Sequence, residues 1–346
     1  MASQNLYQGI RTQVKKNLNR VVERANMEPA IRASTPAPIE EAEAALREFL
    51  GEHGFHVIHE TDVEAIHNHY KLGYPGFKIL KVVRARNFMS CPMASSAVQI
   101  NPGTGAVLPP GIVLYEADGE TRVSAVRPST LLALFTEPDL RETIRELEGH
   151  LWTALEDGLP ESTMLSAEPP VAPGRNDRRA RMKGALNYVL SLVDAEYSMH
   201  VSSPEPPSEV RDALRGALDV RGQKVVGEVA GGQITLVVNP GQAHKLLAID
   251  PDVAVFAPLS AAVFEDGGRT HVRTVRPSTL LIFYTQPDMQ NILMEMEMLL
   301  WNALTRGVPE ARVESRQPPL PPGTGQATTA GGLPGGLDSF RRYRPE

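Results

Sequence analysis

Apolar residues recur at helical spacing in several stretches of the chain. One stripe predicts a helix from Ile39 to about His53, and it consists of Ala42, Ala45, Leu46, Phe49 and Leu50. Gly54 follows this stripe, where a glycine commonly ends a helix. A longer stripe predicts a second helix, which follows Pro138 and runs to about Glu156.

Other stretches alternate between apolar and polar residues and predict strands. Strands are expected at residues 30–34, 55–59 and 77–83. Asp118-Gly119 separates two further alternating runs, at residues 112–116 and 122–126. Because Asp-Gly between such runs is a strong hairpin signal, these two runs are expected to pair as antiparallel strands.

The same order of elements occurs twice, because the chain contains an internal repeat. Val-Arg-Pro-Ser-Thr-Leu-Leu stands at 126–132 and again at 275–281. The later part of the repeat is offset by 149 residues and the earlier part by 168. Copy one therefore holds 19 residues that copy two lacks, all between about Ile58 and Pro109. Two units of this length fit the usual size of a domain.

The repeat divides the chain into four parts. Residues 1–156 form the first repeat with a leading basic amphipathic helix, and residues 157–177 form a proline-rich linker. Residues 178–311 form the second repeat. Residues 312–346 are rich in Pro, Gly, Thr and Ala, and they are expected to form a disordered tail.

Several short motifs resemble the bacterial domain-of-unknown-function family 302. In copy one they are Gly54-Phe55-x-Val57, Thr61-Asp62-Val63-Glu64-Ala65, Lys71-Leu72-Gly73, Phe77-Lys78-Ile79-Leu80, Leu108-Pro109 and Val123-Ser124-Ala125-Val126. In copy two they are Asn239-Pro240, Ala243, Leu246-Leu247, Asp250-Pro251-Asp252 and Ala257-Pro258. The resemblance covers about two thirds of the chain. It implies an α+β fold, in which each copy is a small curved antiparallel sheet packed with helices. Because such domains are often paired, the tandem copies resemble a dimer fused into one chain, a pseudo-dimer. The resemblance implies no settled activity.

The chain departs from this family in its cysteines. Many family members carry a cysteine after the Lys-Ile-Leu strand and another after the Leu-Pro, but here these positions are Val83 and Pro110, and Val238 and Leu259 in copy two. A thiolate is what soft metals and disulfide exchange require, so thiol chemistry is not expected at these positions. Cys91 is the single cysteine of the chain, which excludes an intrachain disulfide.

Composition and charge exclude some classes of function. The net charge of −6 argues against a nucleic-acid-binding protein, which normally carries a basic excess. No stretch has the 18 uncharged apolar residues of a transmembrane helix, and no apolar run follows the first residues as in a signal peptide. A bacterial cytoplasmic location is therefore expected.

Residues 9–24 predict a basic amphipathic helix, which copy two repeats at 178–193. The apolar stripe can dock on its own domain, as in most soluble proteins. The helix can also make a peripheral contact with an anionic membrane through its Arg and Lys residues. The sequence favours the first interpretation and leaves the second open.

Histidines cluster in copy one. His56, His59, His67 and His69 are candidate metal ligands, and a metal or haem site is one hypothesis for them. The alternative is that they are surface or internally hydrogen-bonded side chains, since their spacing matches no known zinc motif. Copy two lacks the cluster, and no cofactor is the primary expectation.

Two further groups are candidate binding residues. Arg127 and Arg276 precede Pro-Ser in each copy, and they are expected either to form internal ion pairs or to bind an anionic ligand. The tail ends in Phe340, Arg341, Arg342, Tyr343 and Arg344. Aromatic residues and arginines dominate binding hot spots, so this segment is a candidate partner-binding motif, with a plain solvated tail as the alternative.

The function predicted first is a non-catalytic accessory or assembly protein, which binds a partner protein through the paired domains and the tail. The alternative is a metal, haem or small-molecule binding protein that uses the histidines of copy one. A divergent enzyme is the third hypothesis, and the sequence argues against it because neither copy displays a complete set of catalytic residues. The pseudo-dimer is intramolecular, and a higher homo-oligomer stays open.

Overall fold

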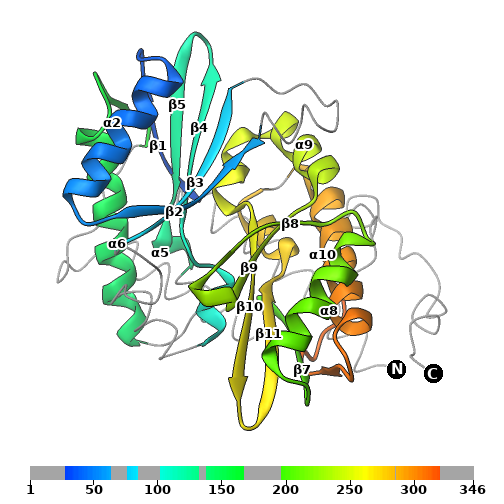
Figure 1. Ribbon diagram of the computed structural model, residues 1–346. Helices are drawn as coiled ribbons and strands as arrows, with labels where there is room; N and C mark the ends of the chain where they lie inside the picture. Colours follow the sequence, from blue (N-terminus) through cyan, green and yellow to red (C-terminus); the bar gives the residue numbers. More distant parts are fainter. Residues whose placement is uncertain are drawn as a thin grey trace.

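The computed structural model describes residues 28–63, 76–84, 102–131, 138–166, 196–284 and 286–319. These residues form two halves, each with one six-stranded antiparallel sheet and helices (Figure 1). The predicted α+β fold with two tandem copies is therefore confirmed.

Copy one forms the first sheet, with strand order β2-β3-β4-β5-β1-β6. Its elements, in chain order, are β1 (Ala30–Thr35), α2 (Ile39–Glu52), β2 (His56–Asp62), β3 (Phe77–Val83), the 3-10 helix η2 (Pro102–Ala106), β4 (Gly111–Ala117), β5 (Glu120–Val126), α5 (Pro128–Leu131), α6 (Pro138–Asp157) and β6 (Thr163–Met164).

Copy two forms the second sheet, with strand order β12-β7-β11-β10-β9-β8. Its elements are β7 (Ser198–Ser203), α8 (Pro207–Asp219), β8 (Lys224–Val229), η3 (Ala230–Gly232), β9 (Ile234–Val238), α9 (Pro240–Ile249), η4 (Pro251–Phe256), β10 (Leu259–Asp266), β11 (Arg269–Val275), η5 (Pro277–Ile282), α10 (Pro287–Gly307) and β12 (Arg312–Val313).

Local sequence explains where these elements begin and end. Ala42, Leu46 and Leu50 of the apolar stripe of α2 are buried, and Gly54 follows the helix with a φ of 76°. Only glycine adopts this left-handed conformation without a steric penalty. Asp118 and Gly119 join β4 to β5, and both have positive φ values, of 55° and 79°. Two positive φ values are what a tight two-residue hairpin turn requires.

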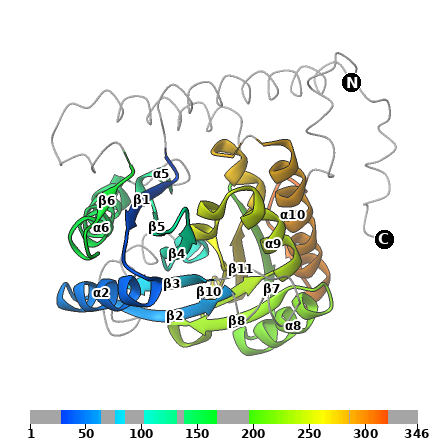
Figure 2. The same cartoon turned by 90° about the horizontal axis from the view of Figure 1, so that it is seen from above.

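Each sheet has one face on its own helices and one face toward the other copy. In copy one, Leu80, Leu114 and Val123 are fully buried in the core with α2 and α6. The helices α8 and α10 cover the outer face of the second sheet in the same way, so the two sheets lie between two helical layers (Figure 2).

A pseudo-twofold relation joins the copies. The 3-10 helix η4 of copy two packs on β4 and β5 of copy one, and η2 of copy one packs on β10 and β11 of copy two. Residues 102 and 251, where these helices begin, differ by the repeat offset of 149. Each copy therefore covers the inner face of the other with an equivalent segment, as in an isologous dimer interface.

The sheets extend beyond the boundaries expected from the repeat. The edge strand β6 comes from residues assigned to the linker, and it pairs with β1. Arg312 and Val313, the first tail residues, form β12 and pair with β7 in the same way. The predicted helices at 9–24 and 178–193 lie outside the described residues. None of the helices in the described ranges has the length and apolar character needed to cross a bilayer.

Candidate functional site between the two copies

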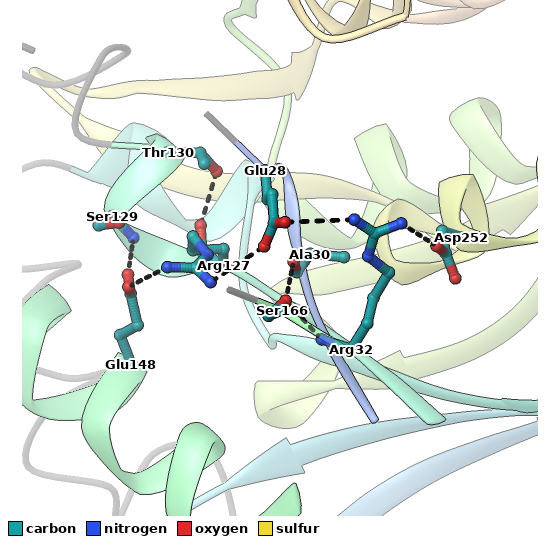
Figure 3. A network of polar contacts seen from close by, with 9 residues as sticks. All are labelled: Glu28, Ala30, Arg32, Arg127, Ser129, Thr130, Glu148, Ser166 and Asp252. Atoms are coloured by element: carbon teal, nitrogen blue, oxygen red, sulfur yellow. Dashed lines mark hydrogen bonds and ion pairs between the residues drawn. The ribbon is translucent and has the colours of Figure 1, made fainter. Parts of the chain in front are cut away.

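The Val-Arg-Pro-Ser-Thr motif of copy one builds a buried ion pair. Arg127 Nη1 lies 3.4 Å from Glu148 Oε1 on α6, and the backbone N–H of Ser129 donates to Glu148 Oε2 at 2.7 Å (Figure 3). The guanidinium group also lies over the ring of Trp152, 5.9 Å from its centre. One carboxylate thus binds both the arginine and the turn that follows it.

Copy two repeats this unit. Arg276 Nη1 lies 2.8 Å from Glu297 Oε1, and the N–H of Ser278 donates to Glu297 Oε2 at 3.1 Å. Arg276 lies over Trp301 at the same 5.9 Å. Both arginines therefore form the internal ion pairs that were one of the two expectations. Their role as ligand-binding residues stays a prediction.

A chain of ion pairs leads from Arg127 to copy two. Arg127 Nη2 lies 3.5 Å from one oxygen of Glu28, and the other oxygen of Glu28 accepts from Arg32 at 3.3 Å. Arg32 Nη1 then lies 3.6 Å from Asp252 Oδ2 on η4 (Figure 3). The motif of copy one is thereby connected, through two more side chains, to the segment that copy two places on this sheet.

Asp252 is the polar anchor of η4. Its Oδ1 accepts hydrogen bonds from Tyr115 at 2.9 Å and from Ser124 at 2.6 Å, both on strands of copy one. Burial, followed by the neighbouring Asp252 carboxylate, raises the pKa of the Tyr115 phenol. Asp250 accepts from the backbone N–H of Asp252 at 3.0 Å, and burial beside that second carboxylate raises the pKa of Asp250. The hydroxyl of Tyr284 is buried, with no hydrogen-bond partner among the described residues.

An apolar cavity of about 60 Å³ lies between the copies. Copy one contributes three residues to its wall: Thr61 on β2, Val63 directly after β2, and Ile79 on β3. Copy two contributes the rest, from β9, α9, η4, β10, η5 and α10 and from the segments that join β9 to α9 and η4 to β10. A buried water needs about 15 Å³ of such space, so the cavity has room for roughly four non-hydrogen atoms.

The polar groups on the cavity wall are engaged elsewhere. Thr61 Oγ1 lies 3.0 Å from His59 Nε2, and Asn239 Oδ1 accepts from the N–H of Gln242 and so caps α9. The other lining residues, such as Leu246, are apolar or are prolines. The wall therefore favours an apolar occupant, because it offers few free hydrogen-bonding groups.

Lys81 lies on the same face of β3 as the cavity-lining Ile79, two residues away. Its side chain is buried, and burial lowers the pKa of Lys81 to about 7. Gly111 is its partner on β4. A Cβ on Gly111 would stand 3.4 Å from Lys81 Nζ and would overlap the carbonyl oxygen of Val255 on η4.

The predicted histidines are only partly described. His56 and His59 lie on β2, where His56 is exposed and His59 is half-buried. Burial and the neighbouring Lys81 lower the pKa of His59. His67 and His69 lie outside the described residues, so the metal hypothesis stays untested. Within the described ranges, no group of three or more His, Cys, Asp or Glu residues is arranged to hold a metal ion.

Sequence reasoning missed the residues that meet at this interface. The partner-binding candidates Phe340 to Arg344 lie outside the described residues. Asp252 appeared only as part of a family motif, and Lys81 was not singled out. Lys81 carried a signal, because apart from Lys78 every other residue of its strand is apolar. The burial of Lys81 also depends on η4, which arrives from the other copy.

A protein-family profile matches both copies of the repeat. The profile of the family described as "Domain of unknown function DUF302" matches residues 31–158 and again residues 197–307. The chain is similar to the protein in a solved structure titled "Crystal structure of uncharacterized conserved protein DUF302 from Bacillus stearothermophilus". The two are 22% identical, and the match covers 38% of this chain and 98% of that chain, with a TM-score of 0.34. No curated protein matched the chain.

The fold and the interface together define a tandem-repeat α+β protein, in which one chain supplies both halves of a dimer-like assembly. Because the family profile matches both copies, the chain belongs to the DUF302 family, with two tandem domains. The name of the family assigns no activity, so function has to be argued from the interface itself.

Proposed function

We propose that this protein is a non-catalytic binding protein of the bacterial cytoplasm, and that it holds a small apolar molecule in the cavity between its two copies. This is the small-molecule alternative expected from the sequence, but with the interface cavity, rather than the histidine cluster, as the site. The observation that carries the proposal is one apolar cavity with walls from both domains.

The position of the cavity supports binding in two ways. Ligand sites commonly lie at domain interfaces and are lined mainly by apolar groups. The fusion of two copies into one chain also lets the two walls diverge, because each copy is free to change alone. Here Thr61, Val63 and Ile79 form one wall, and a different set of residues from copy two forms the other.

A methyl NMR titration with 1-butanol tests the proposal. Saturable shifts are expected at methyl groups from both walls, such as those of Ile79 and Met296. Ala243→Leu fills the cavity from α9 and is expected to abolish these shifts. Ala248→Leu is the matched control, because it makes the same change at an exposed position of the same helix.

The two variants make the outcome decisive. The proposal predicts shifts in the wild type and in the control but none in the cavity-filled variant. It is rejected if the wild type shows no saturable shift, or if Ala243→Leu binds 1-butanol as tightly as the wild type. The predicted docking of a partner protein through the tail stays a separate prediction.

A further inference from the structure

Two residues of copy two, Arg273 and His200, are equivalent to a carboxylate-binding pair in copy one. That pair is Ser124 and Arg32, to which the repeat offsets of 149 and 168 residues relate them. In each copy the two residues lie opposite each other on neighbouring strands, so the equivalence holds in the structure as well. Ser124 Oγ donates to Asp252 Oδ1 at 2.6 Å, and Arg32 Nη1 lies 3.6 Å from Asp252 Oδ2 (Figure 3). Copy one therefore binds a carboxylate at this place on its sheet, and η4 of copy two supplies it.

The equivalent segment of copy one supplies no carboxylate in return. The helix η2 packs on β10 and β11 as η4 packs on β4 and β5, and its residue equivalent to Asp252 is Gly103. The sequence of η2, Pro-Gly-Thr-Gly-Ala, holds no acidic residue. Gly105 lies next to the site, because a Cβ there would stand 3.0 Å from the Cβ of Ala262, the partner of Arg273 on β10. The copy-two site thus receives a glycine where the copy-one site receives an aspartate.

Three basic side chains form a hydrogen-bonded chain at the copy-two site. Arg273 Nη2 lies 3.2 Å from His200 Nδ1, and His200 Nε2 lies 2.8 Å from His271 Nδ1. His271 Nε2 lies 3.2 Å from the backbone oxygen of Asp266. Because a guanidinium group can only donate, a neutral His200 accepts at Nδ1, and each imidazole then donates from Nε2. All three side chains are half-buried, so solvent and small solutes reach them.

The charges at the copy-two site favour an anion. Burial, followed by the charges of Arg273 and His271, lowers the pKa of His200 to about 4, and Glu314 opposes this shift. The Glu314 carboxylate lies 3.5 Å from Arg312 on β12, so it already faces a cation of its own. A carboxylate bound beside Arg273 offsets the positive charge there, and hydrogen bonds between charged partners are the strong ones.

We propose that copy two binds a free small carboxylate, such as acetate, in the place that the side chain of Asp252 occupies in copy one. Arg273 is the main ligand, because the planar N–H groups of a guanidinium match the two oxygens of a carboxylate. His200 lies beside the bound anion, as Arg32 lies beside Asp252. None of these residues lines the apolar cavity, so the inference is independent of the proposed function.

An acetate titration of the full chain tests the proposal. The histidine ring signals are followed by NMR at pH 7, with the ionic strength held constant by chloride. Saturable shifts are expected for His200 and His271, and none for His53 and His56, which are exposed on copy one. The same titration with chloride alone is expected to shift none of the four signals.

Substitution of the main ligand locates the site. Arg273→Ser gives copy two the residue of copy one, and it is expected to weaken acetate binding by about tenfold or more, the effect of losing a hydrogen bond between charged groups. Arg312→Ser is the matched control, because it removes the same charge from an exposed side chain on the same sheet. The control is expected to change the affinity by less than about twofold, since an exposed charge contributes little.

A substitution on η2 supplies the missing carboxylate within the chain. Gly103→Asp is expected to abolish the acetate shifts, because its own carboxylate takes the place of the ligand. It is also expected to unfold at a higher urea concentration than Gly103→Asn, which has the same shape without the charge. Circular dichroism confirms that each variant is folded, and the substitutions at Arg273 and at Gly103 each decide the question without the other.

Several outcomes overturn the inference. They are a wild type without saturable shifts, equal shifts with chloride, and wild-type affinity for acetate in Arg273→Ser or in Gly103→Asp. Binding of 1-butanol in the cavity involves none of these residues, so a failure of the proposed function and a failure of the carboxylate site are seen separately.

Discussion

His59 and Gly227 occupy equivalent positions in the two copies, and they contact each other across the interface. They differ by the offset of 168, and each follows a β-bulge at the same place in its edge strand, β2 or β8. A Cβ on Gly227 would stand 2.6 Å from Nδ1 and from Cε1 of His59. β2 and β8 lie side by side at this point (Figure 2). One copy supplies the ring and the other supplies the space for it.

This contact predicts a coupling between the two positions. Gly227→Ala is expected to destabilise the protein by about 1–3 kcal/mol, because the new methyl group overlaps the imidazole ring of His59. In a His59→Ala background, the same change is expected to cost almost nothing, since the ring is absent. Urea unfolding of the four proteins in a double-mutant cycle measures the coupling. Equal costs in both backgrounds contradict the contact.

A second prediction concerns the docking of η4 on β4. Gly111→Ala is expected to destabilise the protein by on the order of 3 kcal/mol, because its Cβ overlaps the backbone carbonyl of Val255, which no rotamer change relieves. Gly149→Ala is the control, since a Cβ there meets nothing within 4 Å in the middle of α6. That change is expected to stabilise by about 0.5–1 kcal/mol. A similar effect of both substitutions in thermal unfolding contradicts this account.

Much of the fold follows from local sequence. The predicted strand 77–83 coincides with β3, and the helix predicted from Ile39 differs from α2 by one residue at its end. These segments have a clear apolar pattern, and α2 is followed by Gly54, which favours the end of a helix. Local preference and tertiary structure therefore agree. The extra edge strands β6 and β12 were not predicted, because two-residue strands carry no alternation to detect.

The candidate site could not be predicted in the same way. Asp252 accepts hydrogen bonds from Tyr115 and Ser124, which precede it by 137 and 128 residues. Such contacts depend on how the copies dock, and the repeat indicates only that two similar domains exist. The ion pairs of Arg127 and Arg276 were easier to predict, because the two arginines stand in identical motifs. Identical motifs build identical local structures.

A third prediction concerns the buried ion pairs Arg127–Glu148 and Arg276–Glu297. Glu148→Gln and Glu297→Gln are each expected to destabilise their domain by up to about 3–5 kcal/mol, because each removes the buried carboxylate of a buried guanidinium and leaves it only the more exposed Glu28 or Glu196. Glu146→Gln is the control on α6, where Glu146 forms an exposed pair with Arg84 that contributes at most about 1 kcal/mol. Chemical unfolding of all three variants measures the difference. A loss at Glu146 as large as that at Glu148 contradicts the structural role.

The fourth prediction is a pH dependence of stability caused by Lys81. Its pKa is about 7 in the folded protein and near the ordinary 10.5 when the chain is unfolded. Between these values the unfolded chain binds one more proton than the folded protein, so the free energy of unfolding rises with pH. The slope that this group contributes is at most about 1.4 kcal/mol per pH unit. Below pH 7 both states are protonated, and the cost of burying the charge is then at its largest.

Substitution separates this effect from that of the other titrating groups. Lys81→Met keeps the length of the side chain without its charge, so the variant is expected to be more stable than the wild type at pH 7. The advantage is expected to shrink as the pH rises toward 10, because removing the proton from Lys81, which folding requires in the wild type, then costs less free energy. Lys78→Met removes a lysine whose pKa is raised by Glu43, and it is expected to keep the wild-type slope over this range. Urea unfolding at several pH values between 7 and 10 measures the three slopes. A wild-type slope that persists in Lys81→Met would contradict the lowered pKa of Lys81, because it would mean that this lysine stays charged in the folded protein.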